Sequence, residues 1–186
     1  MLAVVPDEMI EERRRLGLDR RDEMWDGVLH MVPPASSAHG RLEQRLAVLF
    51  DRTATSRGIW IIAEPGVFDP NVASMTSYRV PDLGLARPED VSDRGIEGRA
   101  ALVIEVLSPR DDAYAKLPFY RQVGVEELLF VNARTRGFEV RRPLDDGWAL
   151  AEADADGWTQ LASLSVALRL CDGRLQVRSD LGIEEI

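Results

Sequence analysis

Residues 101–107 read ALVIEVL, an apolar stretch that only Glu105 interrupts. Apolar side chains at both odd and even positions are typical of a strand that is covered on both faces. Alternation along such a strand places Val103, Glu105 and Leu107 on the same face, so a carboxylate lies in the middle of a buried strand. The stretch therefore predicts the central strand of a sheet with other elements packed on both sides.

Two helices and a hairpin are predicted before this strand. Residues 6–16 start with proline and acids and end with arginines, the charge order that a helix dipole favours. The Asp-Gly pair at 26–27 lies between apolar residues and predicts a tight hairpin. A longer helix is predicted from Ser36 or Ser37 to about Thr55, because leucine recurs at helical spacing behind a capping serine.

The rest of the chain is predicted to be mostly strands. These strands cover residues 58–63, 67–68, 78–85, 128–131 and 138–142. The charged stretch 87–99 is predicted to be a surface loop, and Ser108-Pro109 to open a helical segment that ends near Val123. We expect a single domain over 1–186 of the α/β or α+β class, with a mixed sheet flanked by helices in a core at about 8–142 and a β-rich extension at 143–186.

Composition limits the function classes. The 186 residues carry 23 basic and 32 acidic side chains, a net charge of −9, which counts against tight nonspecific binding to duplex nucleic acid but leaves room for a locally basic groove. No apolar stretch approaches the ~20 residues of a membrane span, so no membrane partner is expected. A single cysteine excludes an intrachain disulfide and favours the cytoplasm.

Two carboxylates stand in apolar surroundings. Burial of Glu105 costs several kcal/mol unless a cation or hydrogen bonds compensate for it. Two interpretations follow: a structural ion pair with an arginine, or a functional role as a metal ligand or general base. Asp82 follows Pro81 in a second apolar stretch. Carboxylates on neighbouring strands are suited to a hard dication, Mg²⁺ or Mn²⁺, that also binds water and phosphate.

Lys116 is the only lysine among the 23 basic residues. It lies 11 positions after Glu105, on the predicted helical segment, from where a long cationic side chain can reach back over the end of the strand. There it could orient an attacking water or neutralise charge on a phosphate. The alternative, a solvated surface lysine, is left open by the position alone.

These stretches together resemble a known family. PDLGLA at 81–86, LVIEVLSP at 102–109, Lys116 with Tyr120, GVEELLFVN at 124–132 and SSAHG at 36–40 are similar to the Uma family of bacterial proteins. That family is a branch of the PD-(D/E)XK restriction-endonuclease-like superfamily and has long been catalogued as a domain of unknown function. The resemblance covers about Glu8 to Arg142 and implies Mg²⁺-dependent hydrolysis of phosphodiester bonds in nucleic acid, and a homodimer.

The resemblance assigns roles to residues one by one. Asp82 matches the motif aspartate and Glu105 the motif glutamate, both as metal ligands. Leu107 stands where the superfamily usually has its lysine, and Lys116 is similar to a lysine displaced onto the next helix. Pro118 departs from the pattern, because it either starts that helix late or kinks it and so affects the aim of Lys116.

Further candidates have weaker signals. His39 and Glu43 are four residues apart and share one helical face, and superfamily members often carry an acid on this helix. Tyr120 accompanies Lys116 in the motif. Arg134 and Arg136 could contact phosphate, although the solvated side of a hairpin is the more ordinary place for such arginines.

Three function classes follow from these observations. The first is a Mg²⁺-dependent endonuclease that uses Asp82, Glu105 and Lys116. The second is a nuclease fold without activity that binds a partner through its acidic surface. The third is a metal-dependent hydrolase of a small phosphoester, which suits the acidic charge better than duplex DNA does.

Overall fold

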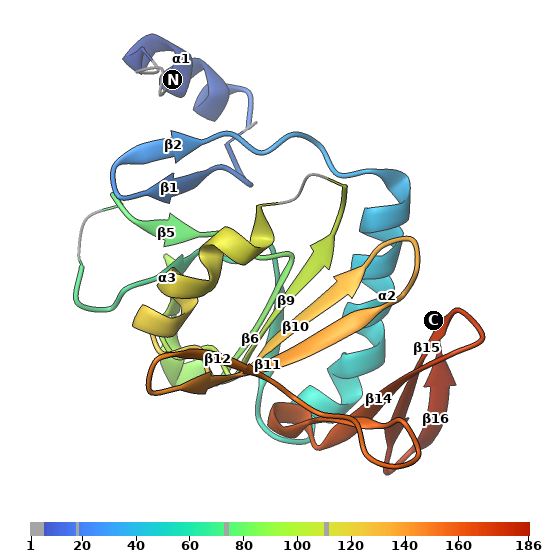
Figure 1. Ribbon diagram of the computed structural model, residues 1–186. Helices are drawn as coiled ribbons and strands as arrows, with labels where there is room; N and C mark the ends of the chain where they lie inside the picture. The colour runs from blue at the N-terminus through green and yellow to red at the C-terminus, as the bar shows by residue number, and fades with distance from the viewer. Residues whose placement is uncertain (1–5, 18, 73–74, 110–111) are drawn as a thin grey trace.

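A six-stranded mixed sheet runs through the middle of the protein, and the strand around Glu105 lies inside it (Figure 1). The computed structural model describes residues 6–17, 19–72, 75–109 and 112–186. The sheet order is β12-β11-β10-β9-β6-β3, with β3 at Trp60–Ala63, β6 at Leu83–Ala86, β9 at Leu102–Leu107, β10 at Leu128–Asn132, β11 at Phe138–Leu144 and β12 at Gly147–Leu150. Because β9 pairs with β10 in parallel and with β6 antiparallel, the predicted central, mixed position is confirmed.

Helix α2 (Ser37–Thr55) covers one face of this sheet. The hydroxyl of Ser36 accepts a hydrogen bond from the backbone N–H of His39, which caps the helix at the predicted end. Leu42, Leu46 and Phe50 recur at helical spacing and are fully buried against the sheet. The cap therefore sets the start of α2 and the position of His39 in its first turn. The apolar residues determine which face of α2 packs against the sheet.

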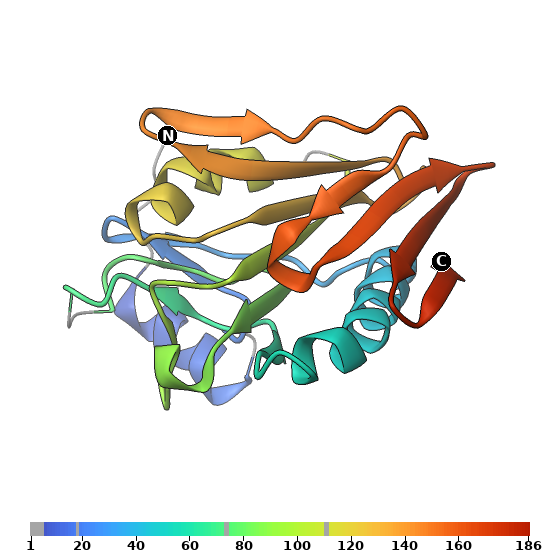
Figure 2. The ribbon, with the colours of Figure 1, turned by 90° about the horizontal axis from the view of Figure 1, so that it is seen from below.

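Helix α3 (Leu117–Gln122) covers the opposite face and follows a short 3₁₀ turn, η2 (Ala113–Lys116). Figure 2 shows α2 and α3 on different sides of the sheet. Pro118 lies in the first turn of α3, where a proline costs no hydrogen bond, so it starts the helix late and does not kink it. The predicted helical segment therefore begins only at residue 113, and its residues 110 and 111 lie outside the described part of the chain.

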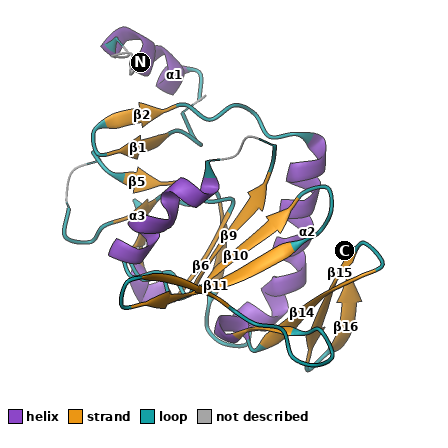
Figure 3. Ribbon diagram, in the orientation of Figure 1, coloured by secondary structure: helices purple, strands orange, loops and turns teal. Residues whose placement is uncertain are grey.

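A second sheet, of short strands, packs beside the central one (Figure 3). Its order is β2-β1-β5-β4-β8-β7, with β1 at Glu23–Trp25, β2 at Val28–His30, β4 at Val67–Phe68, β5 at Tyr78–Arg79, β7 at Val91–Ser92 and β8 at Gly95–Glu97. The Asp-Gly hairpin is confirmed: Asp26 and Gly27 have φ angles of +50° and +85°, as the tight turn between β1 and β2 requires.

Two sequence predictions about this region are wrong. The strand expected over 78–85 is two strands in different sheets, because the chain leaves β5 before Pro81 and enters β6 after Asp82. The stretch 87–99, expected to be a loop, contains the β7–β8 hairpin, since Ile96 is fully buried among its charged neighbours.

The C-terminal extension is rich in strands, as predicted, and it forms a four-stranded antiparallel sheet that packs against α2 (Figure 1). It contains β13 at Thr159–Leu161, β14 at Val166–Cys171, β15 at Arg174–Ser179 and β16 at Gly182–Glu185. Strand β12, although it follows Pro143, extends the central sheet. Helix α1 (Asp7–Arg15) is confirmed at the N-terminal end. Among the described residues, every helix is too short or too polar to cross a membrane.

Candidate active site

Glu105 is buried on the α3 face of β9, with 5% of its surface exposed. The Tyr120 hydroxyl donates to Oε1 at 2.6 Å, and Lys116 Nζ lies 3.0 Å from the same oxygen. Burial raises the pKa of Glu105 to about 7, although the positive charge of Lys116 acts in the opposite direction. A carboxyl group with this pKa exchanges its proton near neutrality, which is what a general base needs.

Lys116 lies between two buried carboxylates. Its Nζ is 2.8 Å from Oε1 of Glu23, which is 2% exposed and also accepts hydrogen bonds from Trp25 Nε1 and Val80 N. Burial disfavours the ammonium, but attraction to Glu105 and Glu23 outweighs it and raises the pKa of Lys116. Lys116 is therefore a buried cation and not a solvated lysine, and the ion-pair partner of Glu105 is this lysine and no arginine of the described chain.

Asp82 stands opposite Glu105, because Leu83 pairs with Ile104 one step further along β6 and β9. Its carboxylate is 4% exposed. It accepts from the backbone N–H of Val106 at 2.7 Å, and lies 2.8 Å from His39 Nε2 and 2.7 Å from Arg21 Nη2. These contacts compensate for the buried charge and fix its position.

His39 and Glu43 join Asp82 in a group with metal-ligand spacing. One ligand atom from each of the three residues lies within 4.8 Å of the others. The hydrogen bond to Asp82 raises the pKa of His39 in spite of burial, and His39 Nδ1 contacts Ser108 Oγ at 3.0 Å. Burial, and then the negative charges of Asp82 and Glu64, raise the pKa of Glu43. Arg21 and His39 act in the opposite direction, so the two carboxylates share this position with a guanidinium and an imidazole.

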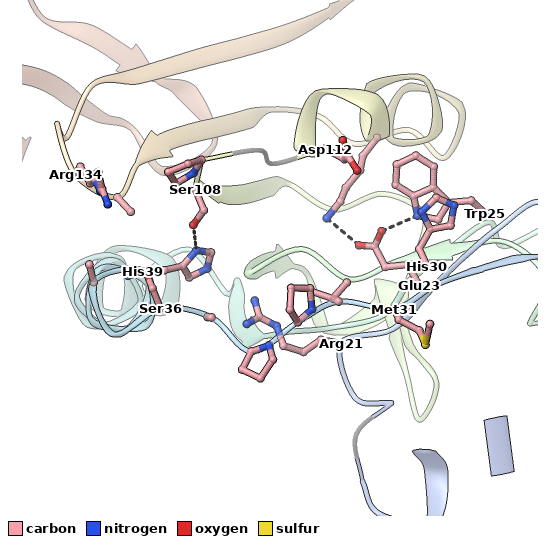
Figure 4. A pocket seen from close by; sticks show the side chains of 18 residues that line it. Arg21, Glu23, Trp25, His30, Met31, Ser36, His39, Ser108, Asp112 and Arg134 are labelled. Atoms are coloured by element: carbon pink, nitrogen blue, oxygen red, sulfur yellow. Dashed lines mark hydrogen bonds and ion pairs between the residues drawn. The ribbon is translucent and has the colours of Figure 1, made fainter. Parts of the chain in front are cut away.

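The side chains around Glu105 and Asp82 border a pocket of about 520 Å³ (Figure 4). Its wall consists of Arg21, Glu23, Trp25, residues 30–36, Ala38, His39, Ser108, Pro109, Asp112, Lys116, Ala133 and Arg134. Three cationic side chains, Arg21, Lys116 and Arg134, and two acids, Glu23 and Asp112, line it. Arg21 and Lys116 are ion-paired with buried carboxylates, whereas Arg134 is exposed.

The predicted site residues form two groups. Glu105, Lys116 and Tyr120 are in contact on the α3 face, and Asp82 contacts His39 with Glu43 close by on the α2 side. Among the described residues, the group with metal-ligand spacing around Asp82 does not include Glu105, which was expected to hold the metal with it. Of the two arginines, Arg134 lines the pocket, whereas the guanidinium of Arg136 donates to the carbonyl oxygen of Ala133 and is absent from the wall.

Sequence reasoning missed Arg21 and Glu23. Arg21 joins Asp82 to Glu64, with its Nε 3.1 Å from the Glu64 carboxylate, and Glu23 shares Lys116 with Glu105. Arg21 precedes the hairpin in a charged run that carries no distinguishing signal. Glu23 does carry one, since it is an acid in a predicted strand, but its partner lies 93 positions away on another element.

A family model and a solved structure are similar to this chain. The model Uma2, described as "Putative restriction endonuclease", matches residues 8–177. The crystal structure of a putative nuclease belonging to DUF820 from Anabaena variabilis matches with a TM-score of 0.60 and 14% identity, over 77% of this chain and 83% of that chain. At this identity the likeness concerns the fold alone. A search of curated proteins gave no match.

Proposed function

The chain belongs to the Uma2 family, and from this membership we propose that it is a metal-dependent endonuclease, which hydrolyses phosphodiester bonds of nucleic acid with Mg²⁺ or Mn²⁺. The membership confirms the resemblance inferred from the motifs around Asp82 and Glu105. One observation above all supports the activity. A buried carboxyl group whose pKa is about 7, Glu105, contacts a buried lysine that lines the pocket.

The residues beside Asp82 fit a divalent cation. The group of Asp82, Glu43 and His39 offers two carboxylates and an imidazole, with one ligand atom of each within 4.8 Å of the others. Arg21 also contacts Asp82 there, so a bound cation would share this carboxylate with the guanidinium. Asp82 and Glu105 were expected to hold the metal; Glu43 and His39 would contribute from the α2 side. Carboxylates suit Mg²⁺ and Mn²⁺, and the imidazole adds preference for Mn²⁺. A bound dication would polarise the phosphate and neutralise its developing charge.

Side chains of the protein would carry out the remaining steps of the hydrolysis. Arg21 and Arg134 would attract the substrate phosphate into the pocket. Glu105 would take a proton from the attacking water as its oxygen bonds to phosphorus and the opposite ester bond breaks. Lys116 would stabilise the extra negative charge, and Tyr120 would hold Glu105 in position through its 2.6 Å hydrogen bond.

A cleavage assay tests this proposal. We expect the purified protein to cut labelled nucleic acid in Mg²⁺ or Mn²⁺ and to leave it intact in EDTA. Single- and double-stranded DNA and RNA are each offered, so the assay also identifies the polymer. Cleavage that persists in EDTA would contradict the metal requirement, and the absence of cleavage of all four polymers would contradict the endonuclease and favour a nuclease fold that only binds.

Metal binding has a readout of its own. At a concentration 100 times its Kd, a metal adds about 2.7 kcal/mol to the free energy of unfolding, which for a chain of this size raises Tm by about 5–10 °C. The substitution Glu43→Gln removes one oxygen ligand and should weaken affinity by about 10-fold or more. Asp145→Asn removes an exposed carboxylate and should keep the full shift. An equal shift in Glu43→Gln and wild type would exclude this group as the metal site.

A small phosphoester is the second candidate substrate, favoured by two observations. The pocket volume of about 520 Å³ matches sites for small ligands, and the net charge of −9 repels a long polyanion. If this candidate is correct, mononucleotides should inhibit hydrolysis of a small phosphoester more strongly than polynucleotides do at equal phosphate concentration. Stronger inhibition by polynucleotides would reject it.

A further inference from the structure

A four-layer stack of side chains ends in the pocket. Phe119 of α3, Arg79 of β5, Trp25 of β1 and His30 of β2 lie in succession, and Trp25 and His30 both line the pocket wall. The Arg79 guanidinium carbon is 4.3 Å from the ring centres of both Phe119 and Trp25. The rings of Trp25 and His30 are stacked at 4.2 Å with 13° between their planes. Since Arg79 and His30 both lie about 4 Å from the centre of Trp25, they occupy opposite faces of it.

A role in stabilising the fold explains the inner side chains of the stack, but it does not explain His30 at the end of the stack. Arg79 is 5% exposed and donates to the carbonyl oxygens of Met24 and Tyr78 within the second sheet, and its contact with the Phe119 ring connects this sheet to α3. Trp25 donates to Glu23 and so supports the Lys116 ion pair. His30 is half-buried, and neither of its ring nitrogens hydrogen-bonds to any other residue in the described ranges. An imidazole with free donor and acceptor atoms is thus present at the pocket end of a rigid aromatic stack.

The arrangement of the pocket matches the parts of a nucleotide. Figure 4 shows Trp25 and His30 at one end, Glu23 beside them, and His39, Ser108 and Arg134 towards the other end. Arg134 therefore lies away from the aromatic end that suits a base and can contact a phosphate, whereas Lys116 contacts Glu23 beside that end. A base has two faces for stacking and edges that form hydrogen bonds. An imidazole with free ring nitrogens can stack on a face and can also form hydrogen bonds with an edge.

We propose that the Trp25–His30 pair is a stacking platform for one unpaired nucleobase, so that the site takes single-stranded or locally unpaired nucleic acid. The inference rests on the proposed function and specifies its substrate class. In an intact duplex both faces of each base are covered by its neighbours, so only an unpaired or flipped base can lie on the platform. The platform also favours a nucleotide over a phosphoester that lacks a base.

Binding in EDTA, without cleavage, tests the platform. Fluorescence anisotropy of a labelled oligothymidylate, a base-free deoxyribose-phosphate chain of equal length, and a duplex gives three affinities for each variant. Wild type should bind the oligothymidylate most tightly. His30→Ala should raise that Kd by about 10-fold and leave the other two unchanged, because stacking on one base is lost. His30→Phe keeps a stacking face and should stay within about 2-fold of wild type.

A matched control removes an aromatic ring elsewhere. Trp60 is 53% exposed on β3 and absent from the pocket wall, so Trp60→Ala should leave all three affinities unchanged. The melting temperature of each variant shows that it is folded, and Trp25→Phe provides a second, milder change of the platform. If folded His30→Ala and Trp25→Phe bind oligothymidylate as tightly as wild type does, or if wild type prefers the duplex, the platform is refuted. Metal-dependent cleavage can still succeed in that case, so the two proposals fail separately.

Discussion

Replacing Lys116 with methionine is expected to lower the free energy of unfolding by about 3–5 kcal/mol at pH 8 and to abolish cleavage. The Lys116 side chain is 11% exposed, and the carboxylates of Glu23 and Glu105 that it contacts are 2% and 6% exposed. Methionine fills much of the same space but supplies no charge. Two buried carboxylates then lack their cation, and desolvation without compensation destabilises the fold.

Urea unfolding at pH 8 and pH 5 measures this effect. At pH 5 the destabilisation should be smaller, because burial already raises the pKa of Glu105 to about 7 and loss of Lys116 raises it further, so the group is neutral. Arg134→Met is the matched control, since it removes an exposed cation from the wall of the same pocket. The double variant Glu105→Gln/Lys116→Met should recover part of the lost stability. A change below about 1 kcal/mol at pH 8 would show that the ion pair is no more than a surface contact.

The part of the site that lies on regular elements was predictable from the sequence. Apolar side chains at both odd and even positions around Glu105 are typical of a strand covered on both faces, so its burial was expected. The Ser36 cap and the leucine stripe of α2 likewise fixed the face that carries His39. Asp82 and Glu105 met because neighbouring strands bring such positions together.

The remainder depends on tertiary packing that local patterns do not encode. Glu23 reaches Lys116 only because the second sheet packs beside α3. Arg21 lies outside the regular strands, where periodicity gives no signal, yet it holds both Asp82 and Glu64. The break at Pro81 was missed because apolar residues continue on both sides of it, so that one strand and two strands have the same pattern.

Glu105→Gln should produce a large loss of activity together with a gain in stability at neutral pH. Glutamine has nearly the same shape but cannot accept the proton of the attacking water, so the cleavage rate should fall by about 100- to 10,000-fold. Initial rates in saturating Mg²⁺ at pH 8 measure this loss. A rate within about 10-fold of wild type would remove Glu105 from the reaction.

The stability change follows from the raised pKa of Glu105. Between the unfolded value of 4.5 and the folded value of about 7, the folded chain still holds a proton that the unfolded chain has released. Stability therefore falls as pH rises through this window, by about 3 kcal/mol in total, and the loss is complete above pH 7. Glutamine does not titrate, so urea unfolding in EDTA should show a smaller fall between pH 4.5 and pH 8 for Glu105→Gln than for wild type.

An exposed carboxylate separates this effect from a general change in charge. Glu152→Gln makes the same chemical change at an exposed position, and its stability should follow the wild-type curve across the pH range. Equal pH slopes in Glu105→Gln and wild type would contradict the buried, protonated carboxyl group. If the activity falls while stability at pH 8 rises, the same carboxylate lowers the stability of the fold and performs the chemistry. Burial shifts its pKa towards neutrality against the effects of Lys116 and Tyr120, and the same burial destabilises its charged form.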